Sequence, residues 1–159
     1  MSEVELVLAD NSEKCTLYTL HFLSEDDTEL EKFISRFKDN AKYNADFQSI
    51  LIFMERILAN GALERYFRRE GRFADSVVAL PVLNSKLRLY CLRLSDHILV
   101  VGNGGVKNTR TYQENDELKG YVMTLQKFER LLKPDAEQRN VEITETEINT
   151  DKTFEIWKG

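Results

Sequence analysis

The chain is poor in the residues that build disulfide frameworks and metal centres, since its 159 residues include two cysteines and two histidines. Cys15 and Cys91 lie in apolar segments typical of strands, whereas disulfide-stabilised domains carry many more cysteines. We therefore expect two reduced, buried thiols. For His21 and His97 we identify no thiol or carboxylate partners that would complete a zinc site. We expect no metal and no cofactor, and we interpret His21 as a structural residue.

Long apolar runs, a basic leader and repeats are also missing. No apolar run approaches the roughly 18 residues that cross a membrane. The N-terminal sequence MSEVELVLAD is acidic and lacks the basic region of a signal peptide. No internal repeat or low-complexity stretch is visible, and the length is typical of one domain. We expect a soluble cytoplasmic protein that does not contact membranes.

An overall surplus of positive charge is missing as well, because the net charge is −5. That balance argues against a general nucleic-acid-binding protein. The charge is uneven, however: residues 65–110 contain nine cations and three acids and so carry +6. Such a segment can bind an anion although the whole chain is acidic; the alternative is a solvated face balanced by nearby acids. The nine cations are Arg65, Arg68, Arg69, Arg72, Lys86, Arg88, Arg93, Lys107 and Arg110.

The stretch SKLRLYCLRLSDHILVVGNGGVKNTRTY, residues 85–112, predicts two antiparallel strands. The strands are residues 86–94 and 97–101, and the second is rich in β-branched residues, as in a strand buried on both faces. Glycines at 102, 104 and 105 are expected to free the backbone where the chain leaves the sheet. Lys107, Arg110 and Tyr112 follow them. The strand pair thus delivers cations and a phenol to one edge, which suits a phosphate-bearing ligand.

Two strands and two helices are expected before this stretch. Residues 4–8 and 15–23 predict a hairpin, unless the first segment is only a frayed lead-in. A first helix follows a capping box formed by Ser24 and Asp27. A second helix begins near Asn44, carries a wide aromatic and methionine stripe that we interpret as core, and stops at Asn60-Gly61. The two helices are expected to cover one face of the sheet as an antiparallel pair.

Residues 63–73, LERYFRREGRF, interleave cations with aromatic side chains. This pattern suits base stacking combined with phosphate contact on a single-stranded nucleic acid. A short amphipathic linker, whose aromatic residues plug the edge of the core, explains the pattern equally well.

The C-terminal part predicts a strand, a helix and an acidic tail. The strand, Ser76–Val82, should lie at an edge or end near Pro81, because proline lacks a backbone donor. Gln113–Lys133 predicts a helix that ends at Pro134. The tail, residues 135–159, has seven acids and three cations, so we divide the chain into a domain at 1–134 and an appendage at 135–159. Its apolar residues are costly to expose, so the tail should add a strand to the domain or to a twin subunit, either over the cationic edge or far from it.

The order strand, helix, helix, three strands, helix indicates an α+β protein. Within that order, the segments LPV, KLRLYCLR and HILVVGNGGVKNTRTYQENDELKGYVMTLQKFERL resemble the toxins of the RelE/ParE superfamily, in particular its phage-derived, HigB-like branch. The resemblance covers roughly residues 15–133. It implies a RelE-like fold, in which two N-terminal helices pack on an antiparallel sheet of about four or five strands, with a C-terminal helix and a strand-like tail.

The resemblance also implies a function: the toxin of a type II toxin–antitoxin system, acting as a metal-independent, ribosome-associated mRNA endonuclease that a helix-turn-helix antitoxin inhibits. Such cleavage needs an activated 2′-hydroxyl, a stabilised phosphorane and a protonated 5′-oxygen. By position, the implied catalytic residues are Arg88, Tyr90, Lys107, Arg110 and Tyr112. The other cations of the basic segment, expected to bind RNA, are Arg65, Arg68, Arg69, Arg72, Lys86 and Arg93.

An alternative hypothesis has the same fold but no catalytic activity. It is a RelE/ParE-fold binding module without nuclease activity, directed at gyrase or binding an antitoxin only. Pairing of two copies through the tail remains open under either reading.

Overall fold

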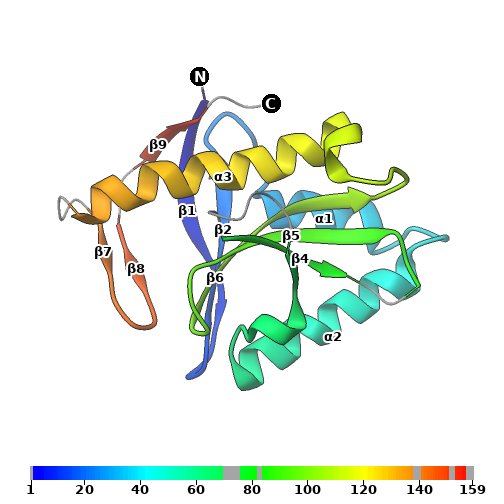
Figure 1. The fold of residues 1–159 in the computed structure, drawn as a ribbon, viewed down its shortest axis with the longest axis horizontal. Helices are drawn as coiled ribbons and strands as arrows, with labels where there is room; N and C mark the ends of the chain where they lie inside the picture. Colours follow the sequence, from blue (N-terminus) through cyan, green and yellow to red (C-terminus); the bar gives the residue numbers. More distant parts are fainter. Residues whose placement is uncertain (1, 70–75, 82–83, 138–140, 151–152, 157–159) are drawn as a thin grey trace.

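The computed structural model describes residues 2–69, 76–81, 84–137, 141–150 and 153–156 (Figure 1). Within these residues three α-helices pack on a mixed β-sheet, so the predicted α+β class is confirmed. The helices are α1 (Glu29–Phe37), α2 (Asn44–Asn60) and α3 (Asp116–Glu137), and two short 3-10 helices are η1 (Glu64–Tyr66) and η2 (Tyr112–Glu114). The strands are β1 (Ser2–Asn11), β2 (Thr16–Phe22), β3 (Arg68–Arg69), β4 (Val77–Pro81), β5 (Leu87–Arg93), β6 (Ile98–Val106), β7 (Glu142–Ile143), β8 (Ile148–Asn149) and β9 (Thr153–Ile156).

The main sheet has the strand order β3-β4-β5-β6-β2-β1-β9 in the described residues. Its neighbours are antiparallel except β2 and β6, which run parallel with Thr16 opposite Ile98 and Thr19 opposite Val101. The expected antiparallel sheet of four or five strands is therefore wrong in size and in direction. The helices also follow the β1–β2 hairpin rather than begin the chain. A parallel neighbour needs a long crossover, and α1, α2 and the meander from β3 to β5 supply it.

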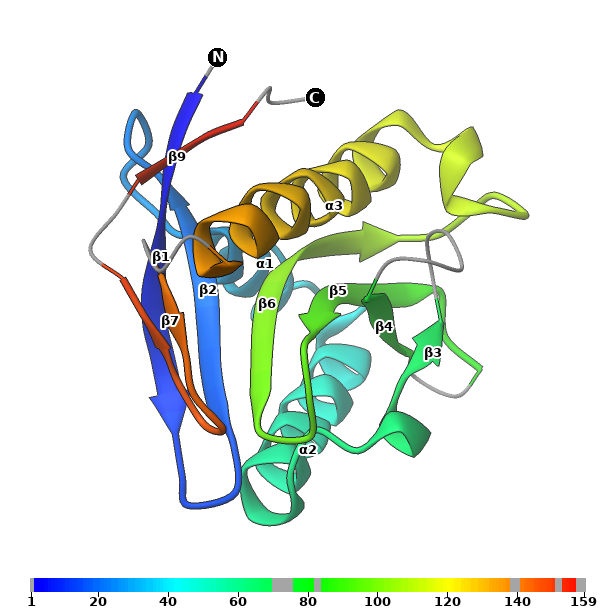
Figure 2. The same cartoon turned by 60° about the vertical axis from the view of Figure 1, so that its left-hand side comes forward.

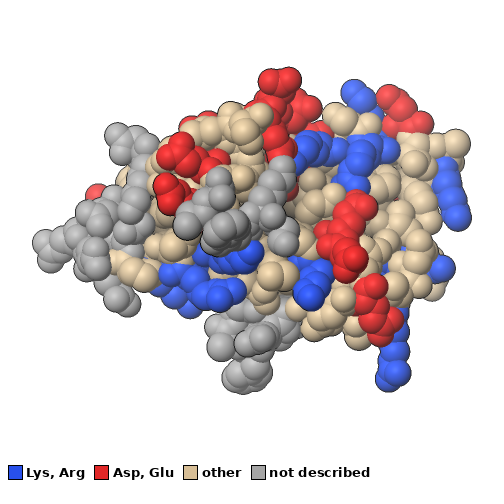
Figure 3. Space-filling view, turned by 90° about the horizontal axis from the view of Figure 1, so that it is seen from above, with Lys and Arg blue, Asp and Glu red and all other residues tan. Residues whose placement is uncertain are grey.

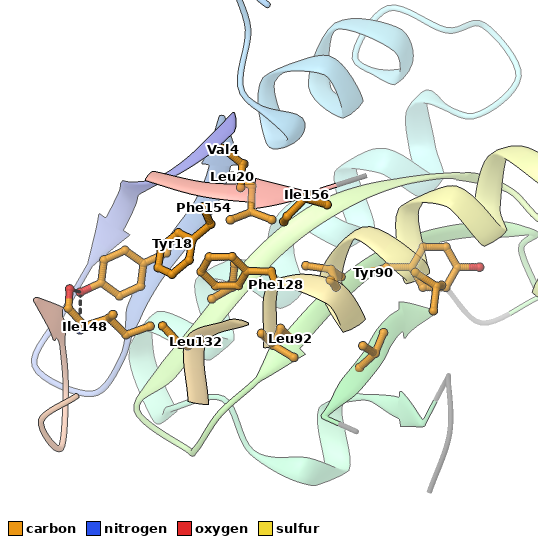
Figure 4. Close-up of a cluster of buried hydrophobic side chains, with 14 of the residues drawn as sticks. Val4, Tyr18, Leu20, Tyr90, Leu92, Phe128, Leu132, Ile148, Phe154 and Ile156 are labelled. Atoms are coloured by element: carbon orange, nitrogen blue, oxygen red, sulfur yellow. Dashed lines mark hydrogen bonds between the residues drawn. The ribbon is translucent and has the colours of Figure 1, made fainter. Parts of the chain in front are cut away.

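Each face of the sheet has its own hydrophobic core. In Figure 2, α3 lies over one face and α1 and α2 lie over the other. Alternate residues of β5 divide between them: Leu89 and Cys91 face α1 and α2, whereas Tyr90 and Leu92 face α3. This period of two is what a strand buried on both faces requires. Figure 4 shows the α3 side, where Phe128 of α3 packs against Phe154 of the C-terminal strand β9. The prediction that α1 and α2 cover one face of the sheet is confirmed.

Local signals explain the helix ends, with two corrections. Thr28 Oγ1 accepts a hydrogen bond from Glu31 N at 3.2 Å, and Glu31 Oε1 accepts one from Thr28 N at 2.9 Å. The capping box of α1 is therefore this pair and not the predicted Ser24 and Asp27. The prediction for α2 is confirmed, because Gly61 (φ 98°) follows its last residue. The prediction that Pro134 ends the last helix is wrong: α3 runs on to Glu137, because a proline in the last turn removes one hydrogen bond without forcing the turn to unwind.

The glycines at the end of the central hairpin stay within the sheet. The β5–β6 hairpin is confirmed, but β6 continues through the glycines to Val106 instead of leaving the sheet at Gly102. The pairing shifts by one residue between Leu89 and Cys91. A Cβ on Gly104 would lie 2.9 Å from the Arg88 carbonyl carbon and closer still to its oxygen. Glycine is thus required here for close strand approach and not for chain exit.

The cysteines and His21 are structural. Both thiols are free and buried, as predicted. Burial raises the pKa of Cys15 to about 11 and raises that of Cys91 as well, so neither thiol is activated as a nucleophile. His21 Nδ1 lies 2.8 Å from Glu5 Oε1 and Nε2 lies 2.7 Å from Glu25 O, which fixes the ring between β1 and the turn after β2.

The tail adds a strand to the sheet, as predicted. β9 pairs antiparallel with β1, and Phe154 and Ile156 are buried against α3, with the Phe128 and Phe154 ring centroids 5.0 Å apart. The short β7–β8 hairpin is held by Tyr18, whose hydroxyl accepts from Ile148 N at 2.9 Å and contacts Ile148 O at 3.3 Å. β9 lies at the opposite end of the strand order from β3, β4 and β5, so it does not cover the cationic edge. Trp157 lies outside the described residues, and the division at residue 134 stays a prediction.

Candidate functional site

Three predicted site residues meet where the β5–β6 hairpin opens. Lys107 N donates to Lys86 O at 2.7 Å, so the two lysines are cross-strand neighbours. Arg88 lies opposite Gly105, two residues further along β5. Alternation along β5 places Lys86 and Arg88 on the α3 face, since Leu87 between them belongs to the other core. We call Lys86, Arg88 and Lys107 the basic strand end.

Arg88 is half-buried, and its guanidinium turns back over the start of its own strand. Nη1 donates to Ser85 O at 2.8 Å and to Leu87 O at 3.0 Å. Ser85 is fixed in turn, because its Oγ lies 2.7 Å from Asp46 Oδ2 at the first turn of α2. The guanidinium of Arg88 is thus held in place at the start of β5. Lys86 is exposed and Lys107 is half-buried beside it.

The two predicted tyrosines are part of the core. Tyr90 has 0% exposure and Tyr112 has 8%. Their ring centroids are 6.4 Å apart at an interplanar angle of 62°, an edge-to-face pair beneath α3. Tyr90 does share the α3 face with Arg88, as predicted, but α3 covers it. In this conformation neither hydroxyl is placed to contact a substrate at the strand end.

The remaining predicted cations are spread over several elements. Arg93 lies at the other end of β5, where Nε donates to Ala62 O at 2.7 Å and the guanidinium pairs with Asp96 and Glu64. These contacts tie β5 to the segment after α2, and the assignment of Arg93 to RNA binding stays a prediction. Figure 3 shows cations and acids interspersed on the face seen there, without one continuous basic surface. The exposed residues are Arg65 on η1, Arg68 on β3 and Arg110 after β6; Arg69 pairs with Val78 through its backbone, and Arg72 lies outside the described residues.

Sequence reasoning missed a polar cluster next to the basic strand end. Arg36 on α1 contacts both β6 and α3. Its Nη2 donates to Asn103 Oδ1 at 2.6 Å and to Gly104 O, both on β6. Its Nη1 lies 2.6 Å from Glu117 Oε1 on α3. Tyr121 OH donates to the same Glu117 oxygen at 2.9 Å. We call Arg36, Asn103, Glu117 and Tyr121 the Arg36 cluster. It joins α1, β6 and α3.

The cluster forms where the parallel strands stop pairing. The β2–β6 ladder ends at Thr19 and Val101, and Thr19 Oγ1 donates to Val101 O at 2.7 Å while accepting from Leu30 N at 3.2 Å. Beyond that point Arg36 supplies the donor that β6 needs at Gly104 O. Asn103 is 3% exposed and also accepts from Gly104 N at 2.8 Å. The cluster therefore has a structural role, closing the gap between two diverging strands.

The charges of the cluster are compatible with binding of an anionic ligand. Burial raises the pKa of Tyr121 to about 12, because it outweighs the nearby Arg36 guanidinium, which lowers the pKa; the hydrogen bond to Glu117 also raises it. Tyr121 is therefore a hydrogen-bond donor at neutral pH. The Glu117 side chain is 55% exposed, so an incoming phosphate or carboxylate can replace it on Arg36. Gly105 has no side chain there, and a Cβ on it would lie 3.9 Å from Arg36 Nη1.

No spacing in the sequence reveals this cluster, because Arg36 lies 81 residues from Glu117 and 67 from Asn103. The part of the chain that the structure describes holds no group of three or more His, Cys, Asp or Glu side chains able to bind a metal ion. Within the same residues, no helix is long and apolar enough to cross a membrane.

Comparisons with known proteins add no relative. No protein-family model, no curated protein and no solved structure matches the chain. The class that the fold defines is therefore an α+β protein with helices on both faces of a mixed sheet.

Proposed function

We propose that the protein is the toxin of a type II toxin–antitoxin system, a metal-independent, ribosome-associated mRNA endonuclease that acts in the cytoplasm and is inhibited by a helix-turn-helix antitoxin. The observation that carries the proposal is the basic strand end. Lys86 and Lys107 lie opposite each other on neighbouring strands and bring two cations to one end of the hairpin, which suits an anionic ligand. Arg88 on the same face adds a fork that matches a phosphate bidentately.

The reaction divides into tasks that these residues can perform. The ribose 2′-oxygen loses its proton and attacks phosphorus, and the 5′-oxygen leaves as a hydroxyl after taking up a proton. Lys86 and the exposed Arg110 hold the phosphates on either side. Arg88 and Lys107 stabilise the charge that develops on the phosphorane.

Proton transfer is the step for which we identify no group among the described residues of the strand end. Tyr90 and Tyr112, the two tyrosines of the predicted site, are both buried against α3. The proposal therefore requires α3 to shift on the ribosome so that Tyr112, the more exposed of the two, reaches the RNA. Their burial favours a second candidate, a binding module that holds an antitoxin or another protein such as gyrase without cleaving RNA.

Expression in a host cell separates the two candidates. The nuclease arrests growth and depletes mRNA, whereas the binding module arrests growth with mRNA intact or has no effect. Arg88→Ala should abolish arrest and cleavage at equal protein levels. The matched control is Arg130→Ala, which removes the same charge from an exposed position on α3. mRNA loss that persists in Arg88→Ala would remove this arginine from the mechanism.

A further inference from the structure

Cation–aromatic contacts gather on the α1–α2–η1 side of the molecule. Four of the six such contacts in the described residues involve residues between Arg36 and Tyr66. The last two are continuous with each other. Arg56 lies 5.2 Å from the centre of the Phe53 ring, and Arg65 lies 5.4 Å from the centre of the Tyr66 ring. The two rings are 6.4 Å apart at 65°, so the four side chains form one row.

The row has a fixed geometry because helix spacing and one hydrogen bond set it. Phe53, Arg56 and Asn60 lie at i, i+3 and i+7 of α2, and therefore on one stripe of the helix. Asn60 Nδ2 donates to Tyr66 OH at 3.0 Å, which holds η1 against this stripe. Both rings pack partly on the core of that face. We call Phe53, Arg56, Arg65 and Tyr66 the aromatic ladder.

The ladder is accessible to a ligand, and its two arginines are exposed. Arg56 and Arg65 are exposed, and the two rings are half-buried. Nearby acids are Glu55, which is exposed, and Glu64, whose carboxylate lies 3.5 Å from Arg93 and so is turned toward another cation. Neither acid forms an ion pair with Arg56 or Arg65 within 4.0 Å in the described residues.

Arg68 links the ladder to the basic strand end around the sheet edge. It follows Tyr66 by two residues on β3, the edge strand, and is exposed. Its register partner is Ala79, whose own partner is Tyr90, so alternation places Arg68 on the same face as Arg88. Arg68 therefore lies next to the ladder in sequence and on the face of the sheet that carries Arg88.

We propose that the aromatic ladder is a stacking surface for single-stranded RNA, with bases on Phe53 and Tyr66 and phosphates on Arg56, Arg65 and Arg68. Rings that alternate with guanidinium groups fit this ligand, because every base has a π face and every linkage a charge. The choice of RNA over other single strands rests on the proposed function. The ladder itself is distinct from the basic strand end, so it binds RNA whether or not the protein cleaves it.

The test is fluorescence anisotropy of a labelled short oligouridylate with the full chain and its variants. Tyr66→Leu removes one stacking ring and should weaken binding roughly 5- to 150-fold. Tyr66→Phe keeps the ring and loses only the hydrogen bond from Asn60, so it should weaken binding much less than Tyr66→Leu. Arg56→Ala and Arg65→Ala, at exposed positions where misfolding is not expected, should each weaken binding and flatten its dependence on salt. Arg130→Ala, on the α3 side, is the charge-matched control and should leave binding unchanged.

The outcomes distinguish this proposal from the proposed function. If RNA binding depends on the ladder but no mRNA is cleaved in cells, the stacking proposal is supported and the proposed nuclease function is refuted. The proposal is overturned if the protein does not bind the oligonucleotide, if the ladder variants bind it unchanged, or if Arg130→Ala weakens binding as much as they do. Self-association of the protein that Arg56→Ala abolishes, with no RNA binding, would assign this face to a second copy of the chain.

Discussion

Gly104 provides the sharpest test of how the basic strand end is built. Alanine at this position would place its Cβ 2.9 Å from the carbonyl carbon of Arg88 and from Leu89 Cα. These are backbone atoms, so relief requires β5 and β6 to separate at the register shift. Overpacking of this kind costs about 3 kcal/mol. At roughly 2–4 °C per kcal/mol for a chain of this size, the melting temperature should fall by about 6–12 °C.

Gly120 is the matched control, because it receives the same methyl group in different surroundings. A Cβ there meets nothing within 4 Å, and the residue lies inside α3. Gly120→Ala should stabilise the protein by about 0.5–1 kcal/mol, since alanine has the higher helix propensity. Urea denaturation of both variants measures the two changes. Equal stabilities, or a Gly104→Ala variant as stable as the unaltered protein, would refute the close approach of the two strands.

Four further predictions concern other parts of the molecule. Tyr18→Phe removes the hydroxyl that holds Ile148, and should lower the free energy of unfolding by about 1–3 kcal/mol; no change in urea midpoint would contradict that role. Thr28→Ala should cost about 1 kcal/mol by the same assay, and Thr28→Ser, which keeps the cap, should cost much less. The pKa of Tyr121 is raised from 10 to about 12 in the folded state, so its contribution to stability is constant below pH 10 and is lost as the pH rises toward 12. In a titration followed by phenolate absorbance, Tyr121→Phe should lack the ionisation step near pH 12. A titration identical to that of the unaltered protein would disprove the assignment. If the protein cleaves mRNA, Arg88→Ala should slow cleavage by about 10²–10³, and Arg88→Lys should not restore it, since lysine cannot bind phosphate bidentately.

Elements with strong local signals could be predicted from the sequence. The stripe of α2 with its Asn60-Gly61 stop, the β5–β6 hairpin and the tail strand agree with the structure because residues close in sequence determine them. The capping box of α1 is also local, in the T-x-x-E pattern of Thr28 and Glu31. The predicted pair, Ser24 and Asp27, lies four residues before the pair that caps the helix.

Long-range pairing explains what sequence reasoning missed. The parallel contact of β2 with β6 has no local signature, and the sheet type was wrong for that reason. The same limit applies to the site. Alternation correctly put Tyr90 on the face of Arg88, but the cover supplied by α3 depends on how a distant helix packs. Arg36 is visible in the sequence only as a cation late in an amphipathic helix, and its partners come from β6 and α3.

The parallel pair at the middle of the sheet has a consequence for synthesis on the ribosome. Thr19 and Val101, which meet there, are 82 residues apart. At roughly 5–20 residues per second, several seconds pass between translation of β2 and translation of its partner. During that interval the nascent β1–β2 hairpin has an unpaired inner edge, and α1 and α2 have only part of their apolar surface covered. We therefore expect chaperones to bind the first half of the chain during synthesis. We also expect slow folding after β6 has left the ribosome, because the contact between β2 and β6 is long-range.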